Sequence, residues 1–137
     1  MYLLDTNVIS ELRKGNKADS RVKEWASNVS SAHLFISAIS VLELEQGVLL
    51  KERKDSKQGA VLRSWLTSHV LPAFSDRMLP VDTAVAQRCA KLHVPDPRSE
   101  RDALIGATAL VHGMTLVTRN IQDFEHMEGI DLLNPWE

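Results

Sequence analysis

The chain has 137 residues, of which 44% are hydrophobic and 25% are charged. This length and composition are typical of a soluble globular protein with a real core, and they exclude an intrinsically disordered chain. The formal net charge of -2 provides no global basic field for nucleic acid. Local cationic groups or bound metal ions could still bind the phosphates of RNA or DNA, so the composition neither indicates nor excludes nucleic acid as a partner. We expect a single domain over residues 1–137.

Cys89 is the only cysteine, which excludes an intramolecular disulfide and disfavours a cysteine-based zinc site within one chain. It falls in a helical pattern, where a buried and unreactive thiol is the expected state. The N-terminus lacks a basic segment followed by a long apolar one, and nowhere do about 18 apolar residues run together. We therefore expect a cytoplasmic protein that does not associate with a membrane.

The first half of the chain alternates short apolar runs with helical patterns. An apolar run at Tyr2–Leu4 stops at Asp5, which predicts a strand followed by a helix at Val8–Arg13. The next predicted elements are a helix around Val22–Val29, a strand at His33–Ile36, a helix at Ala38–Lys51 and a helix at Gln58–Val70 that Pro72 ends. The polar turn between the last two helices predicts a projecting helical arm.

The second half continues this alternation. It predicts a strand at Met78–Val81, a helix that Asp82 or Thr83 caps, a loop at Val94–Glu100, a helix at Arg101–Val111, a strand at Thr115–Thr118, a short helical turn around Asp123 and Phe124, and an edge strand at Ile130–Leu133. Strands that alternate with helices predict the α/β class. The expected architecture is a three-layer α/β/α sandwich around a central, mostly parallel sheet.

Acidic residues fall at the ends of these strands or near the starts of the helices that follow. They are Asp5, Glu43, Asp96, Asp102 and Asp123. The carboxyl ends of parallel strands meet at one edge of a sheet, where ligands bind. Each acid also has a structural interpretation: Asp5 could cap a helix, and Ser40 with Glu43 or Ser99 with Asp102 could form a capping box.

Two observations weaken the capping interpretation for Glu43. The preceding strand ends near Ile36, so Ser37 is the more natural cap and Glu43 falls in the second helical turn. Its neighbours are apolar, and a buried carboxylate without a compensating partner costs several kcal/mol. Glu45 points the opposite way and is expected to face solvent.

Acids that converge without a matching run of Lys or Arg suit a hard divalent cation such as Mg²⁺ or Mn²⁺. A pair of such ions about 4 Å apart could activate a water for attack on a phosphodiester. The five histidines never occur three or four positions from one another, which disfavours a zinc site. The usual motifs of acyl transfer and nucleotide binding, including the P-loop, are absent.

Four ordered segments carry a resemblance: LLDTNVIS, ISAISVLELEQG, RDALIGATAL and LVTRNIQDF. Together they resemble the PIN-domain family, in particular the VapC-like and FitB-like toxins of type II toxin-antitoxin pairs, and the closing NPW is similar to the FitB-like branch. The resemblance spans nearly the whole chain. It implies a ribonuclease that depends on Mg²⁺ or Mn²⁺ and hydrolyses RNA phosphodiesters.

The same resemblance implies roles for individual residues. Asp5, Glu43 and Asp102 would be the main metal ligands, and Thr6, Asn7 and Thr118 would support them through hydrogen bonds. The fourth acid of the family often follows directly after the Thr-Arg pair, where this chain has Asn120. Asp123, one turn later, is the candidate to replace it, and the number of metal ions stays open.

The resemblance also implies partners. A small antitoxin with its own DNA-binding region would cover the site, and toxin homodimers would assemble with it into a larger hetero-oligomer. The arm at Ala38–Leu71 is the predicted contribution to the antitoxin groove. Basic residues that could touch RNA phosphates are Arg13, Lys14, Lys17, Arg98, Arg101 and Arg119.

Three other functions compete with this one. A haloacid-dehalogenase-type phosphatase also has a strand followed by Asp, but it needs a second Asp where this chain has Asn7. A receiver-like signalling module requires paired acids and a late lysine, where this chain has Arg119. A non-catalytic interaction module could use the same acids as caps, and metal binding would distinguish it from a nuclease.

Overall fold

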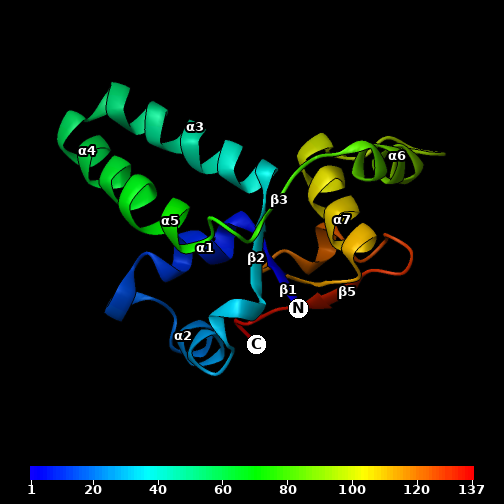
Figure 1. Ribbon diagram of the computed structural model, residues 1–137, viewed down its shortest axis with the longest axis horizontal. Helices are drawn as coiled ribbons and strands as arrows, with labels where there is room; N and C mark the ends of the chain where they lie inside the picture. Colours follow the sequence, from blue (N-terminus) through cyan, green and yellow to red (C-terminus); the bar gives the residue numbers. More distant parts are fainter.

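The computed structural model describes residues 1–137, and its centre is a sheet of five short strands (Figure 1). They are β1 (Tyr2–Leu4), β2 (Leu34–Ser37), β3 (Met78–Leu79), β4 (Thr115–Val117) and β5 (Asp131–Leu133). The order is β3-β2-β1-β4-β5, and every neighbouring pair is parallel. The predicted α/β class with a parallel sheet is therefore confirmed.

Helices cover the two faces of this sheet. They are α1 (Thr6–Leu12), α2 (Ser20–Ser27), α3 (Ala38–Lys54), α4 (Ser56–Trp65), α5 (Leu71–Ala73), α6 (Thr83–Leu92) and α7 (Glu100–His112). Figure 1 shows α1 to α5 on one side of the strands and α6 with α7 on the other. No helix has the length and apolar character needed to cross a membrane.

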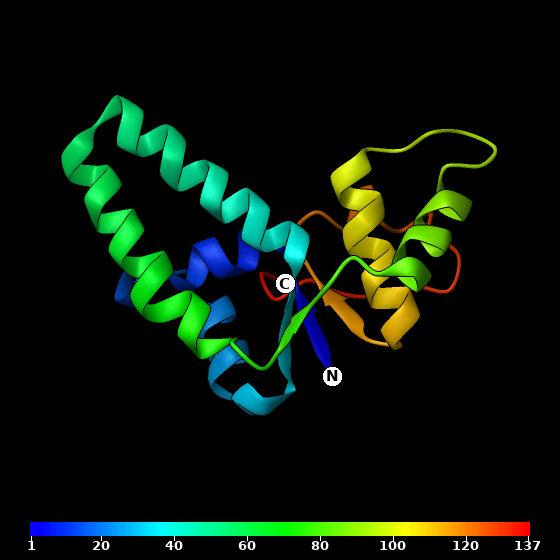
Figure 2. The ribbon, with the colours of Figure 1, turned by 45° about the horizontal axis from the view of Figure 1, so that its top comes forward.

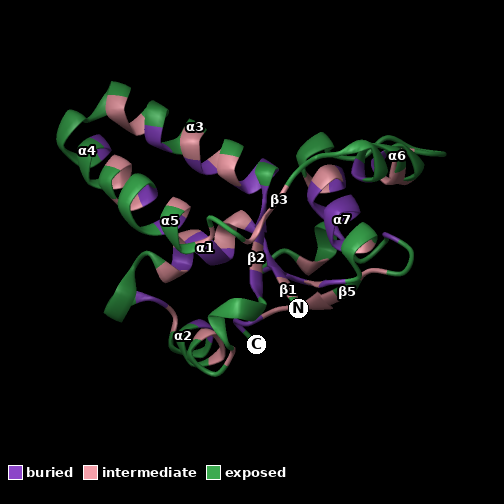
Figure 3. Ribbon diagram, viewed as in Figure 1, coloured by how far each residue is buried: buried purple, intermediate pink, exposed green.

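The alternation of side chains along the strands produces the two hydrophobic layers. Leu4 and Val117 pack on the side of α1 and α3, whereas Leu3 and Leu116 pack on the side of α7 with Ile105. Successive residues of a strand point to opposite faces, so each three-residue strand contributes to both cores. Figure 3 shows the buried residues gathered along the strands and on the helix faces turned toward them.

The arm formed by α3 and α4 projects from the sheet as a helical hairpin (Figure 2). Asp55 ends α3 and caps α4, because its side chain accepts a hydrogen bond from the Gln58 N–H at 3.2 Å. Arg63 of α4 pairs with Glu45 at 2.6 Å and with Glu52 at 3.1 Å on α3. Glu45 is partly exposed, so the expectation that it faces solvent holds in part, and its carboxylate also joins the two helices.

The end of the arm also differs from the sequence-based expectation. The helix passes through a π-helical segment at Leu66–Val70 and continues into α5, which contains Pro72. Proline is tolerated in the first turn of a helix, since no intrahelical partner is required for its missing N–H. Pro72 therefore begins a new turn rather than ending the helix.

The strand order places a topological switch point in the middle of the sheet. From β1 the chain moves outward through β2 to β3, and it then returns to the other side of β1 to add β4 and β5. In open α/β sheets, ligands bind outside the carboxyl ends of the strands at such a point. Asp5 and Thr118 directly follow β1 and β4, so both lie at this point.

Candidate functional site

Asp5 is the central residue of the site. Its backbone N–H donates to the Val117 carbonyl at 2.9 Å, which extends the β1–β4 pairing to the carboxylate itself. The side chain is buried, and it accepts hydrogen bonds from the Thr6 N–H and from the Thr118 hydroxyl, both at 2.8 Å. The Asn7 amide donates a longer bond of 3.4 Å. Asp5 thus caps α1 and also lies at the switch point, so the two interpretations of its role are compatible.

Glu43 reaches the same region from the second turn of α3. The Thr6 hydroxyl donates to Glu43 Oε1 at 2.6 Å and lies 3.0 Å from Ser40 Oγ. Ser37 is the cap of α3, since its hydroxyl accepts from the Ser40 N–H at 3.1 Å. The capping-box interpretation of Glu43 is therefore excluded, and its carboxylate is free to face the site.

Asp102 and Asp123 approach from the other layer of the molecule. Asp102 lies in the first turn of α7, and Asp123 is exposed in a 3₁₀ turn at Ile121–Asp123. Burial raises the pKa of Asp5, and the charges of Glu43 and Asp102 raise it further against the hydrogen bonds from Thr118 and Thr6. Burial likewise raises the pKa of Asp102, with added repulsion from Asp123 and Glu43.

These mutual effects place Asp5, Glu43 and Asp102 in one region of the molecule, with Asp123 near Asp102. No three of these carboxylates have oxygens that all lie within 4.8 Å of one another. Asp96 is not among them: it is exposed in the loop between α6 and α7 and is not a charge that raises the pKa of Asp5 or Asp102. The nearest balancing cation is Arg101, whose guanidinium lies 3.7 Å from Glu43. Four carboxylates beside one arginine leave a local excess of negative charge.

The remaining supporting residues act mainly through the backbone around Thr118. The Asn120 N–H donates to the Thr118 hydroxyl oxygen at 3.0 Å, and the Arg119 N–H donates to the Asn7 side chain at 3.4 Å. Asn120 and Asp123 both line a hollow of about 280 Å³. Either side chain can therefore reach a ligand that enters this hollow.

The chemistry of this donor set fits a hard divalent cation. All four side chains offer carboxylate oxygen, and Mg²⁺ or Mn²⁺ prefers oxygen ligands. A cation would also relieve the repulsion that raises the pKa of the Asp5 and Asp102 carboxyls, both of which are desolvated. The residues that could hold the ion are Asp5, Glu43, Asp102 and Asp123.

A second group of metal-ligating atoms lies elsewhere, where Cys89, His93 and Glu100 have ligand atoms within 4.8 Å of one another. Spacings between histidines alone do not reveal this group, although Cys89 and His93 are one helical turn apart. His93 Nδ1 accepts from the Arg98 N–H at 3.0 Å, so a neutral imidazole carries its proton on Nε2, 3.4 Å from Glu100. Burial also raises the pKa of the Cys89 thiol. These internal contacts make the group a poor metal ligand set.

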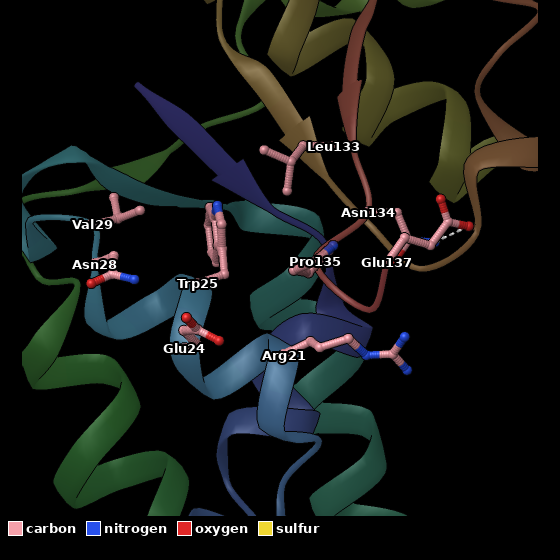
Figure 4. Close-up of a pocket in the computed structure, with 9 residues that line it drawn as sticks. All are labelled: Arg21, Glu24, Trp25, Asn28, Val29, Leu133, Asn134, Pro135 and Glu137. Carbon is pink, nitrogen blue, oxygen red and sulfur yellow. Dashed lines mark hydrogen bonds between the residues drawn. The ribbon is translucent and has the colours of Figure 1, made fainter.

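A further hollow of about 400 Å³ lies between α2 and the C-terminal segment (Figure 4). Trp25, Arg21 and Pro135 are among its lining residues, and Asn134 donates a hydrogen bond to Glu137 at its edge. None of the four converging acids lines it. The acidic site is therefore the stronger candidate for chemistry.

The chain is similar in sequence to known proteins over nearly its whole length. Residues 2–130 match the model of the PIN domain. The chain is 37% identical over 142 residues to the VapC ribonuclease Y4jK of Sinorhizobium fredii, an alignment that covers 100% of this chain and 99% of the relative. It is 36% identical over 142 residues to toxin FitB of Neisseria gonorrhoeae, covering 99% of each chain.

Solved structures show the same similarity. The crystal structure of FitAcB from Neisseria gonorrhoeae superposes with a TM-score of 0.90 at 34% identity, covering 100% of this chain and 99% of that one. The DNA-bound VapBC structure from Salmonella typhimurium gives a TM-score of 0.76 at 21% identity, covering 98% and 97%. At this lower identity the likeness concerns the fold alone.

Proposed function

The chain belongs to the PIN-domain family, and from this premise we propose that it is a metal-dependent endoribonuclease that acts as the toxin of a toxin-antitoxin pair. The observation that carries the proposal is the buried carboxylate of Asp5 at the switch point of the sheet, which Thr6 links to Glu43 by donating a hydrogen bond to each of them. Relatives named as a ribonuclease and as a toxin, each similar over nearly its full length, support the same activity.

We assign the binding of Mg²⁺, with Mn²⁺ as a substitute, to these four acids. When bound, such an ion would lower the pKa of a coordinated water and neutralise charge that develops on the phosphodiester. The protein supplies the orientation of the ligands. Thr118 and the Thr6 N–H each fix one oxygen of Asp5, and the Thr6 hydroxyl fixes Glu43.

Arg101 has a separate role in this proposal. Its side chain is partly exposed and lies 3.7 Å from Glu43, a distance at which the pairing is loose. A guanidinium can bind phosphate through two parallel hydrogen bonds. Arg101 is therefore placed to exchange its contact with Glu43 for a phosphate oxygen of the RNA.

The decisive experiment compares Asp5→Asn with the unmodified protein on RNA. The unmodified protein, freed of partners, should cut RNA with Mg²⁺ or Mn²⁺ and stop when EDTA is added. Asp5→Asn should lose this activity and keep the fold, as judged by circular dichroism. The matched control is Asp131→Asn, an exposed acid of β5, which should cut normally. Equal cleavage by all three proteins, with contaminating nuclease excluded, would refute the proposal.

We further propose that a small antitoxin with a DNA-binding region covers the site, and that the toxin forms homodimers within that complex in the cytoplasm. Solved relatives include FitAB bound to a DNA fragment, at 35% identity. The arm offers exposed apolar side chains at Leu42, Leu49, Leu50 and Val61. Beside it, a hollow of about 180 Å³ is lined mainly by hydrophobic residues of α1, α4 and the segment that follows. Co-expression with any short reading frame that neighbours the gene, followed by co-purification, tests this pairing.

A further inference from the structure

A hollow of about 500 Å³ lies on the side of the sheet covered by α6 and α7. It is bounded by α6, by the loop that joins α6 to α7, and by the segment that follows Asp123. Its nine lining residues include three cations and one histidine, together with apolar residues and one acid, Glu128. The four basic residues, which we call the basic pocket, are Arg88, Lys91, Arg98 and His126.

The cations of the basic pocket are not used by the fold. Arg88, Lys91 and Arg98 form no ion pair with any carboxylate, whereas Arg63 and Arg101 each do. Asp96 and Glu100 each lie two positions from Arg98 in the sequence, and Glu100 faces His93 at 3.4 Å. Within a chain of net charge -2, three unpaired cations around one hollow create a local positive field.

The loop that carries Arg98 is fixed in position. The Arg98 N–H donates to His93 Nδ1 at 3.0 Å, which ties the loop to the end of α6. A cation on a fixed backbone loses less conformational entropy when it binds a ligand. The pocket is thus partly preorganised for an anion.

The chain connects the basic pocket closely to the acidic site. Arg98 precedes Asp102 by four residues, and His126 follows Asp123 by three. An extended chain spans at most about 3.5 Å per residue, so these pairs of Cα atoms are no more than about 14 Å and about 10 Å apart. A short stretch of RNA could therefore span the distance from the pocket to either of these two acids.

We propose that the basic pocket binds a backbone phosphate of the RNA a short distance from the bond that is cut. This inference rests on the proposed ribonuclease function and adds a substrate subsite to it. The acidic site by itself repels a polyanion, and unpaired cations beside it offset that repulsion. Phosphate contacts carry no sequence information, so the pocket positions RNA without selecting bases.

Binding without cleavage is measured with the full-length Asp5→Asn protein in EDTA and a fluorescently labelled single-stranded oligoribonucleotide. The pocket variant carries Arg88→Ala and Lys91→Ala in addition to Asp5→Asn. It should bind the oligoribonucleotide about tenfold more weakly, because charge-assisted hydrogen bonds to phosphate are lost. The slope of log affinity against log salt should fall by about 0.7, the value for one neutralised phosphate of a single strand.

The matched control is Lys23→Ala with Arg53→Ala, which removes the same charges from exposed positions of α2 and α3 that form no ion pair. It should leave affinity and salt slope nearly unchanged. Equal losses in both double variants would mean that only net charge matters, and no loss in the pocket variant would mean that the pocket does not bind RNA. Either result overturns the inference.

Cleavage separates this inference from the proposed function. For cleavage, Arg88→Ala and Lys91→Ala are introduced into the protein that keeps Asp5, and metal is added. This pocket variant should show a raised KM for long RNA and an unchanged rate with a dinucleotide, which is too short to reach the pocket. Normal cleavage of long RNA by the pocket variant overturns the inference and leaves the ribonuclease intact. If the unmodified protein neither binds nor cuts RNA, both fail. Circular dichroism of each variant excludes loss of the fold.

Discussion

The hydroxyl of Thr118 donates a 2.8 Å hydrogen bond to Oδ2 of Asp5, which joins side chains 113 positions apart in the sequence. Thr118 is fully buried, so this contact is shielded from water. It links the ends of β1 and β4 at the switch point and holds the carboxylate on which the proposed metal site depends.

Thr118→Val removes this donor and keeps the shape of the side chain. Loss of one partner of a buried hydrogen bond costs about 1–3 kcal/mol, so the free energy of unfolding in urea should fall by about that amount at neutral pH without metal. Thr115→Val is the control, because it makes the same change at the start of β4, where the hydroxyl has no hydrogen-bond partner. Equal effects of the two substitutions would contradict the assigned role.

Glu43→Gln should weaken Mn²⁺ binding and leave the fold in place. The amide oxygen can still accept from the Thr6 hydroxyl, but the negative charge is lost. Removal of groups that only support a metal ligand costs about 10-fold to 100-fold in affinity, so loss of a ligand charge should cost at least about tenfold. Titration calorimetry measures this. Glu45→Gln, two positions along α3, should bind Mn²⁺ normally, and a comparable loss there would count against Glu43 as a ligand.

Glu11 provides a pH-dependent test of stability. This buried carboxylate accepts hydrogen bonds from the Asp19 N–H and from Lys14, each at 2.9 Å, and these contacts lower its pKa, the Asp19 bond most. A group whose pKa is lower in the folded state stabilises the fold above its unfolded pKa, and the contribution disappears as pH falls through the folded pKa.

Glu11→Gln should therefore lower the unfolding free energy at neutral pH. The difference from the unmodified protein should shrink as the pH falls below about 4.3, the ordinary range of Glu. Urea denaturation across this range measures it, with the exposed Glu24→Gln as control. A difference that stays constant with pH would show that the charge of Glu11 contributes nothing.

Two glycines of the arm should respond in opposite directions to substitution by alanine. A Cβ at Gly47 meets nothing within 4 Å, so Gly47→Ala should stabilise α3 by about 0.5–1 kcal/mol. A Cβ at Gly59 would collide with backbone atoms of Glu52, and Gly59→Ala should destabilise the protein by about 1–3 kcal/mol. Thermal unfolding of both variants checks the pair, and shifts of the same sign would contradict the packing of α4 on α3.

The sequence was sufficient to predict the fold and the position of Asp5 and Thr118 at one edge of the sheet, because both follow from where strands end. Asp5 and Thr118 directly follow apolar runs, and parallel strands bring such positions to one edge. The assignment of metal-binding roles to the acids, and of one domain to residues 1–137, stays a prediction.

Other features depend on how helices pack and could not be predicted from local patterns. The bond from Thr6 to Glu43 and the pairing of Arg63 with Glu45 each require the angle between two helices. The basic pocket forms where three segments of the chain meet. Among its basic residues, only Arg98 was predicted from the sequence to contact phosphate. Cys89 and His93 did carry a readable signal, their spacing of one helical turn.

The central position of β1 also has a consequence during translation. The ribosome makes this strand first, yet one of its two neighbours is β4, which begins at Thr115. A nascent chain holds Asp5 and Glu43 long before Asp102 and Asp123 emerge from the exit tunnel. The full set of acids can assemble only after Asp123 has emerged, so under the proposed function a shorter nascent chain would not cut RNA.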